Sequence, residues 1–236
     1  MNEYTLESSL EGTKTTVYHY PARQKSTEAV FILKGLYGGH IPSGDSWDNE
    51  LVALLQESFH VICVRTGRLD VESKLKQFEG KTFEQECSDF SDAFVYTIEK
   101  VLPKNVRMHS IALSFGGTTL LGLPSVLRAM DTVLFIGSGC GRNPETTKPL
   151  LSTLPDTNIL LTAIRSFERS FLFMHGGRDT IVPLESQKKI FSSAENAAVR
   201  AWIEYPSLGH ELDDVSGSRL AVLANHHLRS FTPRFE

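Results

Sequence analysis

The sequence predicts an α/β fold: a mostly parallel, twisted sheet of about eight strands with helices on both faces. From residue 29 onward, short apolar runs alternate with helix-like stretches, a pattern typical of parallel strands joined by right-handed crossovers. Several of these runs are apolar at nearly every position, as expected for strands covered on both faces. The predicted strands are Thr15–Tyr20, Ala29–Leu33, His60–Arg65, Val106–Leu113, Thr132–Ile136, Phe171–Met174 and Ala201–Tyr205.

The other elements follow from spacing and turn residues. The first 20 residues predict a β-hairpin at the sheet edge, with its turn near Glu11-Gly12. Apolar residues at helical spacing predict helices between the strands. The first lies near Trp47–Leu55, the next over Phe83–Val101 behind a capping box of Thr82 and Gln85, another starts at Pro183, and the last covers Ser216–Phe231.

The chain length of 236 residues allows one large domain or two small ones. Because the alternation is not interrupted by a linker, we expect a single domain over residues 1–236. Residues 137–170 are rich in glycine and proline and are long enough for a small lid segment. The leucines within Gly141–Arg169 suit either a roof over a pocket or ordinary packing of helices against the sheet.

Composition excludes several classes of function. With 24 Lys and Arg against 28 Asp and Glu, the formal net charge is -4, which argues against nucleic-acid and membrane-surface partners. Cys63, Cys87 and Cys140 are too widely spaced for a disulfide framework or a metal site. Neither a secretion signal nor a run of ~20 apolar residues is present, so we expect a cytoplasmic protein without a membrane span. No pattern indicates an oligomeric state.

The segment from Ile111 to Gly117 carries the first candidate for catalysis, Ser114. It lies between an apolar strand and a helix-like run, with Ala112 two residues before it and Gly116 two residues after. Small residues at these places permit a sharp strand-to-helix turn that lifts the serine hydroxyl above the sheet. Taken alone, the segment also fits a strand–glycine–helix junction with a capping serine.

A serine nucleophile needs a general base, and the base needs an orienting acid. Asp179 follows one predicted strand and His210 follows the next, so both project from carboxyl ends, where open parallel sheets keep their sites. Each residue alone also fits a turn or a surface loop. Their occurrence in the order Ser114, Asp179, His210 favours a catalytic triad.

A glycine-rich segment, Lys34 to Gly39, directly follows the strand Ala29–Leu33. Glycines let such a loop turn its N–H groups toward a site. We expect the N–H groups of Leu36 and Phe115 to form an oxyanion hole, in which each donor is worth ~3–4 kcal/mol. The alternative is a flexible loop at the end of a strand.

The four segments together resemble the α/β-hydrolase fold family of serine esterases, thioesterases and related acyl hydrolases. The resemblance covers about Thr15 to Phe231. Ala112-x-Ser114-x-Gly116 matches the nucleophile elbow of that family, the segment Gly177 to Pro183 its acid loop, and Gly209-His210 its base loop. Lys34-Gly35-x-x-Gly38 resembles the oxyanion loop, although Lys34 stands where histidine is usual and Ala112 where glycine is commoner.

The resemblance implies a serine hydrolase with little or no cap that cleaves carboxylic ester or thioester bonds of small molecules through an acyl-enzyme. It implies no metal and no organic cofactor. Two alternatives remain open: an acyltransferase with the same triad, and a non-catalytic homologue that binds a small molecule. Arg65, Arg68 and Arg142 follow predicted strands and suit either an anionic substrate group or solvated loops.

Overall fold

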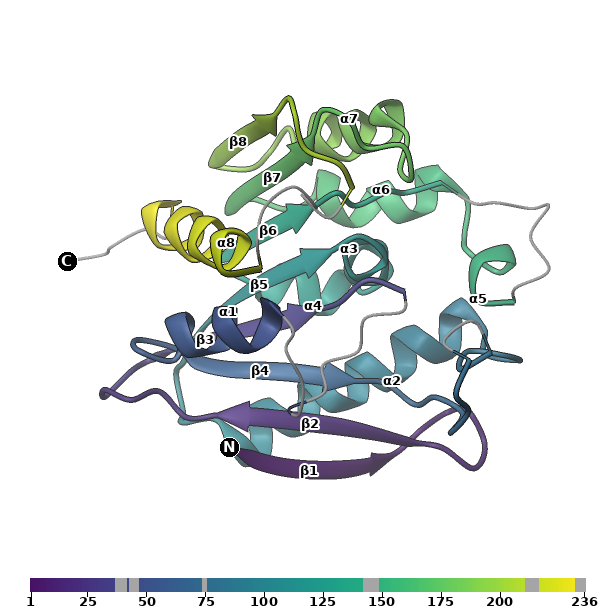
Figure 1. Cartoon of the computed structure of the whole chain (residues 1–236), viewed down its shortest axis with the longest axis vertical. Coiled ribbons are helices and arrows are strands. Elements are labelled where there is room, and N and C mark those ends of the chain that lie inside the picture. Colours follow the sequence, from purple (N-terminus) through teal and green to yellow (C-terminus); the bar gives the residue numbers. More distant parts are fainter. Residues whose placement is uncertain (37–41, 43–46, 74–75, 142–148, 211–216, 232–236) are drawn as a thin grey trace.

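The computed structural model describes residues 1–36, 42, 47–73, 76–141, 149–210 and 217–231. Its strands form one sheet in the order β1-β2-β4-β3-β5-β6-β7-β8 (Figure 1). β2 pairs antiparallel with β1 and with β4, and every other pairing is parallel, which confirms the predicted fold class. The strands are β1 (Asn2–Glu7), β2 (Lys14–Tyr20), β3 (Glu28–Leu33), β4 (His60–Arg65), β5 (Arg107–Leu113), β6 (Thr132–Ile136), β7 (Ser170–Gly176) and β8 (Val199–Tyr205).

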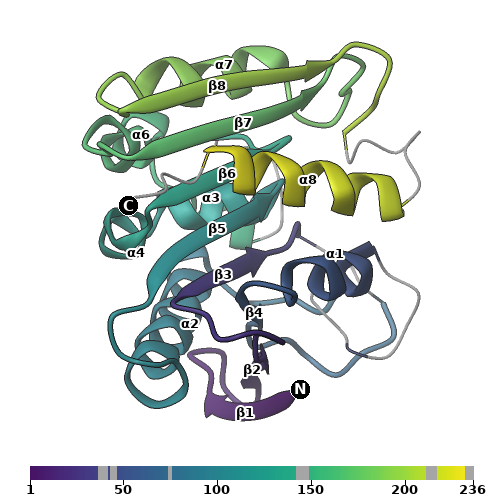
Figure 2. The same cartoon turned by 90° about the vertical axis from the view of Figure 1, so that its left-hand side faces the viewer.

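Helices cover both faces of the sheet. One face carries α1 and α8, side by side in Figure 2, and the other carries α2, α3, α4, α6 and α7. None of the described helices is long and apolar enough to cross a bilayer. The helices are α1 (Trp47–Leu55), α2 (Phe83–Tyr96), η1 (Thr97–Val101), α3 (Phe115–Leu121), α4 (Pro124–Ala129), α5 (Pro149–Ser152), α6 (Thr157–Arg165), α7 (Leu184–Ser193) and α8 (Gly217–Phe231).

The two-sided burial explains why the central strands are continuously apolar. In β3, Phe31 and Leu33 point into the core under α2 and α3, whereas Val30 and Ile32 point into the core under α1 and α8. Successive side chains of a strand leave opposite faces of the sheet, so both faces need apolar residues when both are covered.

The N-terminal hairpin lies at the sheet edge as predicted. β1 pairs with β2 in a register that places Tyr4 opposite Val17. Gly12, in the predicted turn, has φ +73°, a backbone conformation that favours glycine. The helix predicted over Phe83–Val101 departs from expectation only at its end, where the last turn widens into the π-helical η1. There the Thr97 hydroxyl donates to the carbonyl of Ala93.

The described part of residues 137–170 packs as ordinary helices. α5 lies against α2, and α6 lies against α3, α4 and α7. Leu150, Leu154, Leu160 and Leu161 are buried in the same core as these helices. For these residues, packing against the sheet describes the structure better than a roof over a pocket. Residues 142–148 lie outside the described part.

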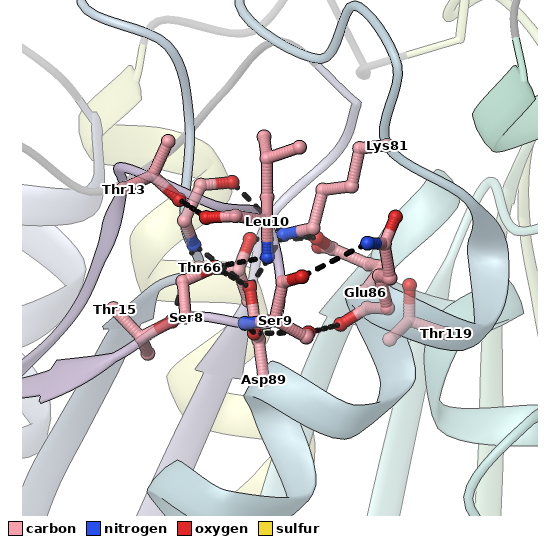
Figure 3. A network of polar contacts seen from close by, with 12 residues as sticks. Ser8, Ser9, Leu10, Thr13, Thr15, Thr66, Lys81, Glu86, Asp89 and Thr119 are labelled. Carbon is pink, nitrogen blue, oxygen red and sulfur yellow. Dashed lines mark hydrogen bonds and ion pairs between the residues drawn. The ribbon is translucent and has the colours of Figure 1, made fainter.

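A buried ionic cluster joins the hairpin, the end of β4 and the start of α2 (Figure 3). Lys81 Nζ lies 2.6 Å from Glu86 Oε2 and 2.7 Å from Asp89 Oδ2, and donates to the carbonyl of Gly67 at 2.9 Å. Neither Lys81 nor Asp89 exposes any side-chain surface. Ser8, Ser9 and the Gly67 N–H also donate to Asp89, so segments far apart in sequence meet at one carboxylate.

Candidate active site

Ser114 occupies a sharp turn between β5 and α3. Its backbone has φ 52° and ψ −119°, a conformation that L-residues rarely adopt and that costs about 1–3 kcal/mol. Gly116 explains how the chain tolerates this turn: a Cβ atom there would lie 2.5 Å from the carbonyl oxygen of Leu33. The sequence pattern of small residues around Ser114 therefore reflects close approach of the turn to the end of β3.

The structure brings Ser114, His210 and Asp179 together. The Ser114 Oγ lies 2.9 Å from His210 Nε2, and His210 Nδ1 lies 2.9 Å from Asp179 Oδ2. The three residues follow β5, β8 and β7, at the carboxyl edge of the parallel strands. The Asp179 side chain is fully buried and that of His210 is 11% exposed, so the hydrogen bond between them is shielded from solvent. Ser114 is partly exposed.

Asp179 is held as a carboxylate by its surroundings. Its Oδ1 accepts the N–H groups of Ile181 and Val182, both at 2.9 Å. Burial pushes the pKa of Asp179 up, but the hydrogen bond from His210 and those from Val182 and Ile181 outweigh it, so the pKa lies below its ordinary value. The carboxylate thus stays ionised at neutral pH and favours the imidazole tautomer with hydrogen on Nδ1.

The glycine-rich loop after β6 supports the same site. Gly137 has φ +55°, and a Cβ there would lie 2.8 Å from the His210 carbonyl oxygen and 3.5 Å from Asp179 Oδ2. A side chain there would clash with the His210 carbonyl oxygen, whereas the distance to Asp179 Oδ2 is an ordinary van der Waals contact. This requirement accounts for a glycine at position 137, within the glycine-rich segment that follows β6.

The predicted oxyanion loop approaches Ser114 from β3. A Cβ at Gly35 would lie 3.3 Å from the Ser114 Cβ and 3.8 Å from its Oγ, so the loop passes directly beside the hydroxyl. Leu36 is half-buried against the core cluster that contains Phe115, and Phe115 is the first residue of α3. Gly38 lies outside the described residues.

Comparisons with known proteins identify the fold. No family model and no curated protein matches the chain. Among solved structures, Est1E from Butyrivibrio proteoclasticus with bound ferulic acid is similar with a TM-score of 0.71 at 13% identity, over 97% of this chain and 98% of that one. The peroxisomal alpha-beta-hydrolase Lpx1 from Saccharomyces cerevisiae has a TM-score of 0.71 at 12% identity, over 100% and 90%. The chain has the α/β-hydrolase fold.

A further α/β-hydrolase neighbour, the esterase domain of a Rhodothermus marinus protein, has a TM-score of 0.61 at 15% identity, over 98% of this chain and 99% of that one. At these identities the likeness concerns the fold. What the site does therefore has to be argued from the side chains of this chain.

Other chemistry-bearing residues are less suited to a site. Among the described residues, no group of three or more His, Cys, Asp or Glu side chains suits a metal ion. Cys63, Cys87 and Cys140 are all buried. Burial raises the pKa of the Cys87 thiol to about 12 and also raises that of Cys140, so neither is a ready thiolate.

The three arginines considered as contacts for an anionic substrate group lie in different surroundings. The Arg68 guanidinium lies 4.5 Å over the ring of Phe78, and burial lowers its pKa to about 10. Arg65 is half-buried at the end of β4, and Arg142 lies outside the described residues. The burial of Arg68 argues against a solvated loop there, whereas both alternatives, a substrate anion and a solvated loop, stay open for Arg65.

One residue at the site was not singled out from the sequence. Gln187 on α7 is fully buried, and its Nε2 donates to Asp179 Oδ2 at 2.9 Å. A signal was present: Gln187 lies three residues before the buried Ile190, and so on the inward face of the predicted helix, where a polar residue requires a partner.

Proposed function

We propose that this protein is a serine hydrolase that cleaves carboxylic ester or thioester bonds, with Ser114 as nucleophile, His210 as base and Asp179 as orienting acid. The observation that carries the proposal is the continuous chain of two 2.9 Å contacts from Ser114 Oγ through His210 to Asp179, built on a serine with positive φ. Acyl transfer by a serine requires that the nucleophile lies within hydrogen-bond distance of its base, and the base within hydrogen-bond distance of the acid that orients it.

The proposed reaction has two steps. His210 Nε2 takes the proton of the Ser114 hydroxyl as its oxygen attacks the carbonyl carbon, and the imidazolium is stabilised by the buried carboxylate of Asp179. The same proton then passes to the leaving alcohol or thiol, and the C–O or C–S bond breaks. Water, deprotonated by His210, hydrolyses the acyl-enzyme and restores the serine.

We assign the oxyanion hole to the N–H groups of Leu36 and Phe115. Support comes from Gly35, which passes beside the Ser114 hydroxyl, and from the position of Phe115 at the N-terminus of α3, where backbone N–H groups lack helical partners. Donors so placed stabilise the tetrahedral intermediate rather than the substrate carbonyl.

The choice of ester substrates draws support from two neighbours that are named esterases, the Rhodothermus marinus domain and a thermophilic esterase from Thermogutta terrifontis. Transfer to an acceptor other than water uses the same triad and stays an alternative. A non-catalytic binding protein is the alternative of another class. The contact between Ser114 Oγ and His210 Nε2 allows proton transfer from the hydroxyl and so favours catalysis. A binding protein has no need of a strained serine beside a base.

A fluorophosphonate probe tests the proposal on the purified full-length chain. We expect stoichiometric labelling and hydrolysis of short p-nitrophenyl esters, both lost in Ser114→Ala. Ser207→Ala is the matched control: Ser207 is exposed in a second Ser-x-Gly segment, Ser207-Leu208-Gly209, and its loss should leave both signals unchanged. Folded protein that is neither labelled nor active would overturn the proposal in favour of a binding role.

A second measurement separates hydrolysis from transfer. Thioesters and esters of graded chain length are supplied with and without an alcohol or amine acceptor, and both products are quantified. Free acid as the main product under all conditions supports the hydrolase. Product transferred to the acceptor in preference to 55 M water would instead assign an acyltransferase.

A further inference from the structure

A buried amide lies directly behind the carboxylate of the proposed triad. Gln187 belongs to the first turn of α7 and has no exposed surface. Burying an unpaired amide is costly, so its hydrogen bonds have to be made inside the protein. Its Nε2 donates to Asp179 Oδ2 and to the carbonyl of Val182, both at 2.9 Å, and its Oε1 lies 3.0 Å from His175 Nδ1.

These contacts fix the orientation of the amide. Asp179 Oδ2 and the Val182 carbonyl oxygen only accept hydrogen bonds, so the NH₂ group of Gln187 has to face them. Its carbonyl oxygen then faces His175, whose Nδ1 must carry a hydrogen. His175 is itself buried and packs against Trp202, with ring centroids 5.2 Å apart. Hydrogen-bond donors therefore reach Asp179 Oδ2 from two sides, Gln187 and His210.

The two oxygens of Asp179 are held by different means. The backbone N–H groups of Ile181 and Val182 anchor Oδ1, whereas Oδ2, the atom that meets His210, has Gln187 as its second donor. Because one Gln187 nitrogen binds both Oδ2 and the Val182 carbonyl, it also ties the carboxylate to its own loop. Removal of this amide would leave His210 alone to set the position of Oδ2.

We propose that Gln187 is a positioning residue of the triad: it orients the carboxylate of Asp179 and, through it, the imidazole of His210. The inference rests on the proposed function. A neutral donor suits this place, because it adds a hydrogen bond to Oδ2 without adding a proton that Asp179 would have to share. A carboxylate in its place has no hydrogen to donate at neutral pH and repels Asp179.

Within the described part of the chain, the titratable groups nearest Gln187 belong to the site itself. Asp179 and His175 contact it, and His210 lies beyond Asp179. The charged residues next to it on α7, Lys188 and Lys189, are exposed. A carboxyl introduced at position 187 would thus interact mainly with Asp179, and a proton bound by that pair would restore one hydrogen bond.

The experiment measures kcat and KM with a short p-nitrophenyl ester between pH 5.5 and 9 for the full chain, Gln187→Met and Gln187→Glu. Phosphonate titration normalises each rate to folded sites. We expect Gln187→Met to lower kcat about 10–100-fold at every pH with KM within about 3-fold. At pH 8, Gln187→Glu should lower kcat at least as much as Gln187→Met does. As the pH falls, the ratio of its kcat to that of the wild type should rise at least about 5-fold, because protonation of the introduced carboxyl restores a hydrogen-bond donor. Gln56→Glu, the same change at a half-buried amide that donates to the Pro21 carbonyl, should keep the wild-type profile.

The outcomes separate the two proposals. Wild-type protein that reacts with the phosphonate supports the proposed function whatever Gln187 does. If that protein is active and Gln187→Glu shows a pH-independent ratio to wild type, the positioning role is wrong, even when the rate is reduced. The ratio is taken per titrated site, so partial unfolding does not imitate the effect. A Gln187→Met variant that fails to fold leaves the decision to Gln187→Glu.

Discussion

The buried cluster around Lys81 gives the most direct prediction of stability. We consider Lys81→Met, which keeps most of the side-chain volume and removes the charge. Lys81 makes three contacts, with Glu86, Asp89 and the carbonyl of Gly67, and has no exposed side-chain surface. The variant leaves two carboxylates close together in the interior without their shared cation.

The magnitude follows from the partners that remain. Removing one member of a buried ion pair costs about 3–5 kcal/mol. Asp89 still accepts from Ser8, Ser9 and the Gly67 N–H, which favours the lower end, whereas the Gly67 carbonyl loses a donor worth about 1 kcal/mol. We therefore expect a loss of about 3–4 kcal/mol in the free energy of unfolding. At about 3 °C per kcal/mol for a chain of this size, the melting temperature should fall by about 10 °C.

The pH dependence provides a sharper test. Burial raises the pKa of Asp89, but hydrogen bonds from Lys81, Ser9 and Ser8 bring it below its ordinary value. In the wild type this carboxylate therefore contributes stability that is present above pH about 4 and is lost as the pH falls further. Without Lys81 burial dominates and the folded-state pKa rises, so the deficit of the variant should be largest near pH 8 and shrink toward pH 5.

Urea denaturation followed by far-UV circular dichroism at pH 8 and pH 5 measures both quantities. Adding Glu86→Gln to Lys81→Met should recover at least about 1 kcal/mol at pH 8, because one uncompensated charge is removed, whereas Glu86→Gln alone should destabilise. A deficit below 1 kcal/mol, or one that is equal at both pH values, would refute the reasoning.

Three further predictions concern the site and the sheet edge. Gly116→Ala should reduce esterase activity more than 100-fold, because its Cβ would meet the backbone of Leu33; Gly141→Ala, whose nearest neighbour atom is 4.0 Å away, should leave the rate unchanged. Asp179→Asn should lower kcat about 10³–10⁴-fold in the same assay with the fold retained by circular dichroism; a loss below 10-fold would contradict its assignment. Burial and the neighbouring His60 lower the pKa of His19 to about 4, so its contribution to stability is complete above pH 6.5 and declines below it. Between pH 7.5 and 5 this should cost about 2 kcal/mol in urea unfolding, and His19→Phe, which cannot titrate, should flatten that slope by the same amount.

The sequence predicted the elements of the site because those elements are local. The turn at Ser114 requires small neighbours within two residues, and that requirement is visible in Ala112 and Gly116. Asp179 and His210 were found because each directly follows an apolar strand. In each case the signal lies within a few residues of the functional side chain.

Gln187 and Lys81 show what sequence pattern does not reveal. Gln187 is an ordinary polar residue of an amphipathic helix until α7 packs beside the Asp179 loop. Lys81 belongs to a charged stretch before α2, and its burial depends on carboxylates at residues 86 and 89 and on serines 8 and 9 of the distant hairpin. Such partners are chosen by packing, not by spacing along the chain.

The sequence by itself determined the α/β class, the edge hairpin and the three residues proposed for the triad, because hydrophobic periodicity and turn-forming residues are properties of neighbouring positions in the chain. Only the tertiary structure decided that α5 packs against α2 and α6 against α3, α4 and α7, that Gly137 makes room for His210, and that an amide lies behind Asp179. These features depend on which surfaces come into contact when the helices pack on the two faces of the sheet. Contacts between residues distant in sequence leave no periodic pattern in the sequence, so only the folded structure reveals them.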